Sequence, residues 1–172
     1  MFNMDFDIRQ IRDYYDTQLQ EYDYNQLLSL GVSRHNADFM IEVGIPAQLD
    51  IFVFYKIVHF QKCTLGGESF IQIGHYSFSQ YGLYLKEGSS ALYASSSFHE
   101  PHVYKLNQDM KSFFLFYLVR NEVAMQMRQE GKYTTYIYAD ELRKIYEELD
   151  PIAMNNVEGY WSHLIEDYET GL

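Results

Sequence analysis

Three short strand-like segments follow one another in the middle of the chain, and this pattern constrains the fold more than any other feature. Residues 70–74, 81–86 and 91–95 are rich in β-branched and aromatic side chains. The connection Glu87-Gly88-Ser89-Ser90 has typical turn chemistry. Strands separated by short loops form an antiparallel meander, so we expect one here.

Two further segments extend this predicted sheet. Residues 50–59 are β-branched and aromatic on both faces, which is typical of a central strand. Residues 102–104 are a candidate edge strand.

Apolar residues with helical spacing precede and follow the predicted strands. Ser33 and Asn107 are good N-cap residues, and Gly44 followed by Pro46 ends the helix that begins at Ser33. Pro151 fits the first position of a short helical turn. The predicted helices cover residues 5–22, 33–43, 107–129, 139–149 and 157–168.

These elements predict an α+β fold in which a mainly antiparallel sheet of about four to six strands packs against helices. A chain of 172 residues fits one domain, with residues 1–23 as a possible acidic helical extension at the N-terminus. Aromatic residues make up 17% of the chain, so we expect a core rich in Phe and Tyr.

The cellular compartment is indicated by two features of the chain. The single cysteine, Cys63, excludes an internal disulfide and fits a reducing environment. The first residues lack a secretory signal, and no apolar stretch approaches the roughly 18 residues of a membrane span. We therefore expect a cytoplasmic protein without a membrane partner.

The acidic residues are concentrated at the two ends of the chain. The net charge is −11, yet residues 24–138 hold nine acidic and nine basic side chains. Residues 1–23 hold six acids against two arginines, and residues 139–172 hold nine acids against Arg143 and Lys144. Carboxylates confined to predicted helices form either a solvated helical face or an acidic recognition surface, and the latter would attract a basic protein and repel nucleic acid.

Most sequence signatures of catalysis are missing. The chain has no glycine-rich phosphate loop, no nucleophile elbow and no cluster of Lys and Arg, so we expect no cofactor and no direct nucleic-acid partner. The carboxylate pairs are neighbours on solvent-facing helices, whereas a hydrolase needs two carboxyl groups that converge across a cleft. His99, Glu100 and His102 could ligate zinc, but Pro101 makes this segment a loop and no further ligand has a readable spacing.

The order of the motifs resembles that of the SUKH superfamily, and most closely that of its fourth immunity-protein subfamily. The resemblance covers roughly residues 25–170 and rests on the succession of short apolar motifs. The motifs are Gly44-Ile45-Pro46, Phe70-Ile71-Gln72-Ile73-Gly74, Gly82-Leu83-Tyr84-Leu85, Ala91-Leu92-Tyr93, Ser112-Phe113-Phe114-Leu115-Phe116-Tyr117-Leu118, Asp150-Pro151 and Tyr160-Trp161-Ser162-His163-Leu164-Ile165-Glu166.

This resemblance implies a SUKH-like α+β domain and a bacterial immunity protein. Such a protein binds and neutralises a cognate polymorphic toxin, often a nuclease, and it has no catalytic residues. At positions that match the family motifs we interpret four residues as structural: Gly44, Pro46, Gly74 and Trp161.

The charge pattern and the aromatic content nominate contact residues for a basic protein toxin. The expected contacts are Asp140, Glu141, Glu147, Glu148 and Asp150, with Tyr81 and Tyr84 as aromatic anchors. Two alternatives remain: a scaffold or regulatory interaction module of the same fold, and a metal-dependent hydrolase that uses His99, Glu100 and His102. The sequence leaves the oligomeric state open.

Overall fold

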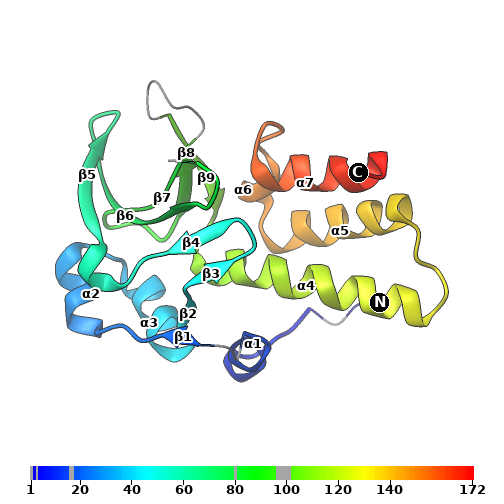
Figure 1. Cartoon of the computed structure of the whole chain (residues 1–172), viewed down its shortest axis with the longest axis horizontal. Coiled ribbons are helices and arrows are strands. Elements are labelled where there is room, and N and C mark those ends of the chain that lie inside the picture. Colours follow the sequence, from blue (N-terminus) through cyan, green and yellow to red (C-terminus); the bar gives the residue numbers. More distant parts are fainter. Residues whose placement is uncertain (1, 3, 16–17, 80, 96–101) are drawn as a thin grey trace.

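The protein folds around a seven-stranded antiparallel sheet (Figure 1). The computed structural model describes residues 2, 4–15, 18–79, 81–95 and 102–172. The strand order is β3-β4-β6-β7-β8-β9, and β5 pairs with β6. The strands are β3 (Gln48–Leu49), β4 (Phe52–Phe54), β5 (Gln61–Leu65), β6 (Glu68–Tyr76), β7 (Gly82–Lys86), β8 (Leu92–Ser95) and β9 (Val103–Asn107). The predicted α+β fold with a mainly antiparallel sheet is therefore confirmed, with more strands than expected.

The long strand β6 organises the sheet, because β5 pairs with its first half and β4 with its second half along the same edge. The turn between β5 and β6 consists of Gly66 and Gly67, whose φ angles are +58° and +80°. Glycine adopts these angles without steric cost. Gly74 follows a register shift in β6, and a Cβ there would lie 2.2 Å from the carbonyl oxygen of Val53. Only glycine lets β4 approach β6 this closely.

Helices cover one face and one side of the sheet. α4 is the central helix, α1 packs on one side of it, α5 packs on the other, and α7 packs on α5 (Figure 1). The helices are α1 (Ile8–Tyr14), α2 (Tyr24–Leu30), α3 (Arg34–Glu42), α4 (Met110–Gln129), α5 (Thr135–Leu149), α6 (Pro151–Met154) and α7 (Tyr160–Thr170). A 3₁₀ turn, η1 (Ile57–His59), connects β4 to β5. None of the helices in the described ranges is long and apolar enough to cross a membrane.

Aromatic side chains fill the core where the sheet, α5 and α7 pack against α4. Phe116 of α4 stacks on Tyr146 of α5 with ring centroids 3.8 Å apart, and Trp161 of α7 packs edge-on against both rings. The Tyr146 hydroxyl donates a hydrogen bond to the Phe116 carbonyl oxygen, and the Trp161 indole N–H donates to Oδ1 of Asn107. Buried aromatic residues with polar atoms thus have partners, as burial in a protein core requires.

Gly44 and Pro46 connect α3 to the sheet. Gly44 has a φ of +81° just after α3, which allows its N–H to bond to the Met40 carbonyl oxygen. A Cβ at Gly44 would also lie 3.0 Å from Cβ of Leu19. Leu19 and Pro46 are opposite each other in a separate two-stranded sheet formed by β1 (Leu19–Gln20) and β2 (Ile45–Pro46).

Several boundaries differ from the sequence-based expectations. The helix expected over residues 5–22 stops at Tyr14, because the chain then extends and β1 pairs with β2. The strand expected over residues 50–59 is limited to Phe52–Phe54, because η1 interrupts it. The helix expected from Asn107 is capped instead by Asp109, whose carboxylate accepts from the Ser112 N–H at 2.7 Å.

Candidate functional site

α5 presents a stripe of acidic side chains because its opposite face is apolar. Tyr138, Leu142 and Tyr146 are buried against α4 and α7 at helical spacing. The Thr134 hydroxyl caps the first turn by accepting from the Ile137 N–H. The acidic residues of this helix therefore lie on its outer side, where Asp140, Glu147 and Glu148 are exposed and Glu141 is half-buried.

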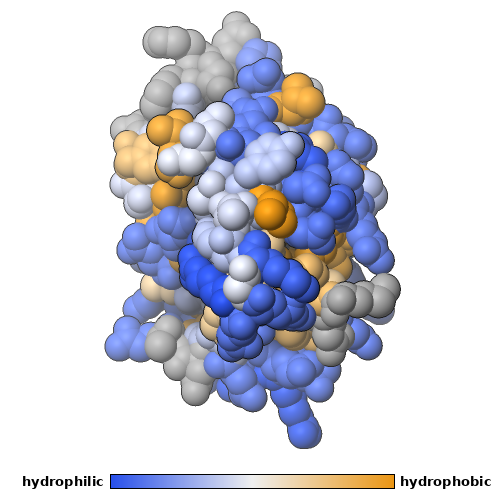
Figure 2. Space-filling view, turned by 90° about the vertical axis from the view of Figure 1, so that its right-hand side faces the viewer, coloured by the Kyte–Doolittle hydropathy of each residue, from blue (hydrophilic) through white to orange (hydrophobic). Residues whose placement is uncertain are grey.

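α7 adds three more carboxylates beside α5. Trp161 and Ile165 are fully buried, so Glu166, Asp167 and Glu169 lie on the outer side of the helix. An ion pair between Arg143 and Glu169, 2.8 Å long, connects the two helices. We call seven carboxylates, of which six are exposed and Glu141 is half-buried, the carboxylate surface: Asp140, Glu141, Glu147, Glu148, Glu166, Asp167 and Glu169. Figure 2 views the side of the molecule where α5 begins and α7 ends, and it is mostly hydrophilic.

The carboxylate surface keeps a negative excess after its internal ion pairs are formed. Lys144 bonds to Asp140 at 2.7 Å and to Glu141 at 3.1 Å, and these bonds raise the pKa of the Lys144 ammonium. Both basic residues of residues 139–172, Arg143 and Lys144, are thus already paired. Within the described part of the chain, Glu147, Glu148 and Asp167 have no lysine or arginine at ion-pairing distance.

The structure corrects the prediction that Asp150 contacts a partner. Asp150 is 0% exposed and caps α6, where its carboxylate accepts from the Ala153 N–H. The same carboxylate accepts from the Asn107 amide at 3.0 Å and from the Gln108 N–H at 2.8 Å. Burial raises the pKa of Asp150, and these three N–H donors counteract part of that effect. Asp150 therefore joins β9 to α6 and is inaccessible to a partner.

The acidic residues of α1 and the carboxylate surface lie on different sides of α4. α1 packs against α4 on the side away from α5 and α7 (Figure 1). Two of the N-terminal acids also have local roles, because Asp7 and Asp23 cap α1 and α2. The described N-terminal acids that lie in or cap α1 and α2 therefore do not extend the carboxylate surface.

The two tyrosines expected to be anchors lie on the sheet rather than on the carboxylate surface. Tyr84 is 8% exposed, and its ring packs edge-on against Phe70 with centroids 6.2 Å apart. A Cβ at Gly82 would lie 2.2 Å from the Tyr84 hydroxyl oxygen, so the ring covers this glycine. Tyr84 is therefore a packing residue and not an exposed anchor. Tyr81 is half-buried beside Tyr76, and its contact with a partner stays a prediction.

A cavity of about 430 Å³ on the sheet was not predicted from the sequence. It is lined by residues from the strands and the connections between them: Tyr55, Gln72, His75, Ser79 and Tyr84. Nδ1 of His75 lies 3.0 Å from the Tyr55 hydroxyl oxygen. The lining includes the Ser79 hydroxyl and the His75 imidazole, but the hydrogen bonds described for them go elsewhere: Ser79 accepts from the Tyr81 N–H, and His75 bonds to Tyr55. The lining contains no carboxylate that could orient the imidazole as a base for the serine.

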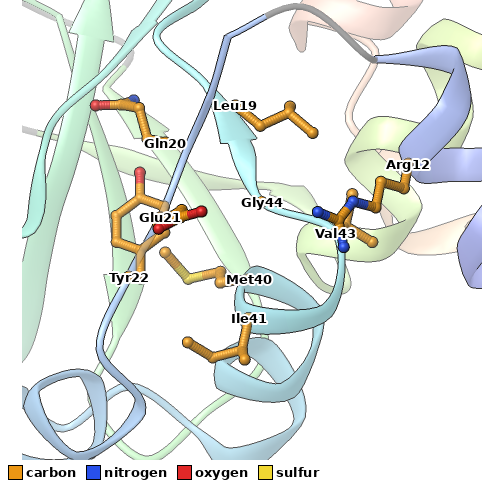
Figure 3. Close-up of a pocket in the computed structure, with 9 residues that line it drawn as sticks. All are labelled: Arg12, Leu19, Gln20, Glu21, Tyr22, Met40, Ile41, Val43 and Gly44. Carbon is orange, nitrogen blue, oxygen red and sulfur yellow. The ribbon is translucent and has the colours of Figure 1, made fainter.

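A second cavity, of about 220 Å³, lies between β1 and the end of α3 (Figure 3). Met40 and Val43 give the cavity apolar lining, and Arg12 and Glu21 line it from two other segments of the chain. Arg12 donates a weak 3.4 Å hydrogen bond to the Glu42 carbonyl oxygen. This arrangement contains no acid–base pair within hydrogen-bonding distance and resembles a surface hollow more than a reaction site.

The alternative of a metal-dependent hydrolase gains no support from the described residues. His99 and Glu100 lie outside them, and His102 is the described member of that cluster. Among the residues with described positions, no group of three His, Cys, Asp or Glu side chains could hold a metal ion. Cys63 is half-buried, and burial raises the pKa of its thiol, which disfavours the nucleophilic thiolate.

Comparisons with known proteins found no matching family model, no matching curated protein and no matching solved structure.

Proposed function

We propose that this chain is a non-catalytic immunity protein that binds and neutralises a basic bacterial toxin in the cytoplasm. The observation that carries the proposal is the unbalanced charge of the carboxylate surface. Its seven carboxylates share Arg143 and Lys144, and both basic groups are already engaged within the surface. Mutual repulsion among the remaining carboxylates disfavours folding slightly, and a cationic partner relieves this repulsion.

The buried face behind the carboxylate surface favours docking without rearrangement. α5 is anchored by Tyr138 and Tyr146, whose hydroxyls bond to backbone carbonyl oxygens of α4. α7 is anchored by Trp161 and by the Arg143–Glu169 ion pair. Helices held this way present their carboxylates in fixed positions, so little conformational entropy is lost on binding.

The negative charge of the carboxylate surface indicates the chemistry of the partner. A nuclease toxin has a basic active site because it must hold phosphate, and a helical carboxylate surface can cover such a site. Opposite charges steer the encounter and raise the association rate at low salt. The SUKH resemblance supports the same conclusion, because immunity is the function that it implies.

Co-expression with the toxin encoded beside this gene tests the proposal. We expect the protein to restore growth to cells that produce the toxin and to co-purify with it as a complex that weakens with salt. Binding to host proteins without restored growth would favour the interaction-module alternative. Absence of both rescue and complex formation with every neighbouring toxin would contradict the proposal.

A further inference from the structure

Strand β5 forms a free edge of the sheet. It pairs only with β6 among the strands of the described ranges, and Figure 1 shows it at the rim with no strand beyond it. Gln61, Lys62 and Thr64 are exposed, and none of their backbone groups has a hydrogen bond outside the β5–β6 hairpin in the described part of the chain. An unpaired strand edge is a template for another strand.

The register of the hairpin determines which backbone groups of β5 point outward. The Ser69 carbonyl oxygen accepts from the Glu87 N–H at 3.0 Å, so the backbone of Ser69 faces β7 rather than β5. Thr64 lies opposite Ser69, and its N–H and C=O therefore point away from β6. Because the pattern alternates along a strand, the N–H and C=O of Lys62 also point outward.

The side chains of β5 make its two faces different. Cys63 and Leu65 pack beside a buried cluster on one face of the sheet, which contains Phe70 and Tyr93. Lys62 lies on the other face, where its ammonium group pairs with Glu87 at 3.1 Å. The half-buried strip formed by Cys63 and Leu65 thus ends at the free edge.

We propose that two copies of this chain associate through antiparallel pairing of their β5 strands, centred on Cys63. In this register Lys62 of each copy lies opposite Thr64 of the other, and the outward groups of both residues form four hydrogen bonds. Gln61 lies opposite Leu65, so all five residues of β5 are paired. The dimer continues the sheet across the two-fold axis and places the Cys63 and Leu65 strips of the two copies side by side on one face.

Other symmetric registers are less favourable. A register centred on Lys62 places two lysines directly opposite each other, which is destabilising. A register centred on Thr64 places Lys62 opposite Gly66, which lies in the turn with a φ of +58° and cannot extend the ladder. Self-pairing around Cys63 is thus the register that this sequence best accommodates.

Two substitutions at one exposed position give opposite results if the proposal is correct. Thr64→Glu places a carboxylate opposite Lys62 of the other copy, and we expect dimerisation to strengthen by about 2- to 30-fold. Thr64→Lys places two lysines opposite each other, and we expect a weakening of similar size. General charge repulsion predicts the reverse order, because the protein is strongly acidic and Thr64→Glu makes it more so.

The measurement is sedimentation equilibrium at concentrations up to about 1 mM, since an interface of this size is weak. Matched circular dichroism and melting curves show whether the variants keep the monomer fold. We expect the order Thr64→Glu, wild type, Thr64→Lys at low salt and convergence of the three at high salt. A monomer at every concentration, or a dimer that both variants leave unchanged, would overturn the proposal.

Cys63 reports the register directly. In this register the two Cys63 residues form a non-hydrogen-bonded antiparallel pair. The Cα atoms of such a pair are about 4.5 Å apart, a distance that a disulfide can span. Diamide oxidises two thiols to a disulfide and takes up their two protons and two electrons. At about pH 9, where more of the half-buried thiol is ionised than at neutral pH, we expect wild type to cross-link faster than Thr64→Lys. Equal rates in the two proteins would exclude this register.

Discussion

Substitution of Asp150 tests the claim that one buried carboxylate joins the sheet to the C-terminal helices. Asp150→Ala leaves three N–H donors without their acceptor: the Asn107 amide, the Gln108 N–H and the Ala153 N–H. Each buried unsatisfied donor costs about 1–3 kcal/mol, and these costs are not additive. Removal of an unfavourably buried charge offsets part of the loss, so we expect a net destabilisation of about 3–5 kcal/mol.

Asp150→Asn should have an intermediate effect. The amide oxygen can accept on one side, but the amide NH₂ then faces at least one of the N–H donors on the other side. We expect a loss of about 1–3 kcal/mol. Asp140→Ala is the matched control, because Asp140 is exposed at the other end of α5 and should leave stability close to that of wild type.

Urea unfolding measures these differences. With a slope of about 2 kcal/mol per M, Asp150→Ala should lower the midpoint by roughly 1–3 M, and Asp150→Asn should lie between it and wild type. If Asp150→Ala were as stable as Asp140→Ala, the buried hydrogen bonds of Asp150 would have no structural role, and the reasoning would be refuted.

Three further predictions concern stability. Gly74→Ala should destabilise by about 1–3 kcal/mol, because its Cβ would collide with the Val53 carbonyl; a change below 0.5 kcal/mol in urea unfolding would contradict this. Because burial raises the pKa of Asp150, the native state binds the carboxyl proton more tightly than the unfolded chain does. The free energy of unfolding of wild type, measured relative to that of Asp150→Asn, should therefore fall as pH rises from the ordinary carboxyl range through the raised pKa. An increase over this pH range would contradict the raised pKa. Trp161→Phe removes the indole donor to Asn107 and leaves a small void, so the melting temperature should decrease by several degrees, and no decrease would show that this contact is dispensable.

Local patterns predicted the elements whose partners are close in sequence. The apolar spacing of Leu142, Ile145 and Tyr146 predicted the buried face of α5, and Ser33 caps α3 as expected. The prediction that Asp150 contacts a partner was wrong because it rested on the charge pattern alone. An Asp directly before Pro151 is also typical of an N-cap, and this signal could have indicated its structural role.

Features that depend on pairing between distant segments could not be predicted in the same way. The helix ends at Tyr14 because Leu19 pairs with Pro46, and periodicity near Tyr14 contains no information about that pairing. The sheet cavity depends on the register that brings Tyr55 to His75. Strand β5 was missed, although the Gly66-Gly67 pair that follows it is a strong hairpin signal.

The most direct test of the carboxylate surface compares association rates for two double charge reversals. Glu147→Lys with Glu148→Lys changes the carboxylate surface, whereas Asp13→Lys with Glu21→Lys makes the same charge change at exposed positions near α1. Stopped-flow binding to the cognate toxin at low salt should show a rate about 10-fold or more lower for the first variant and within about twofold of wild type for the second. Equal rates in the two variants would contradict a docking role for the carboxylate surface.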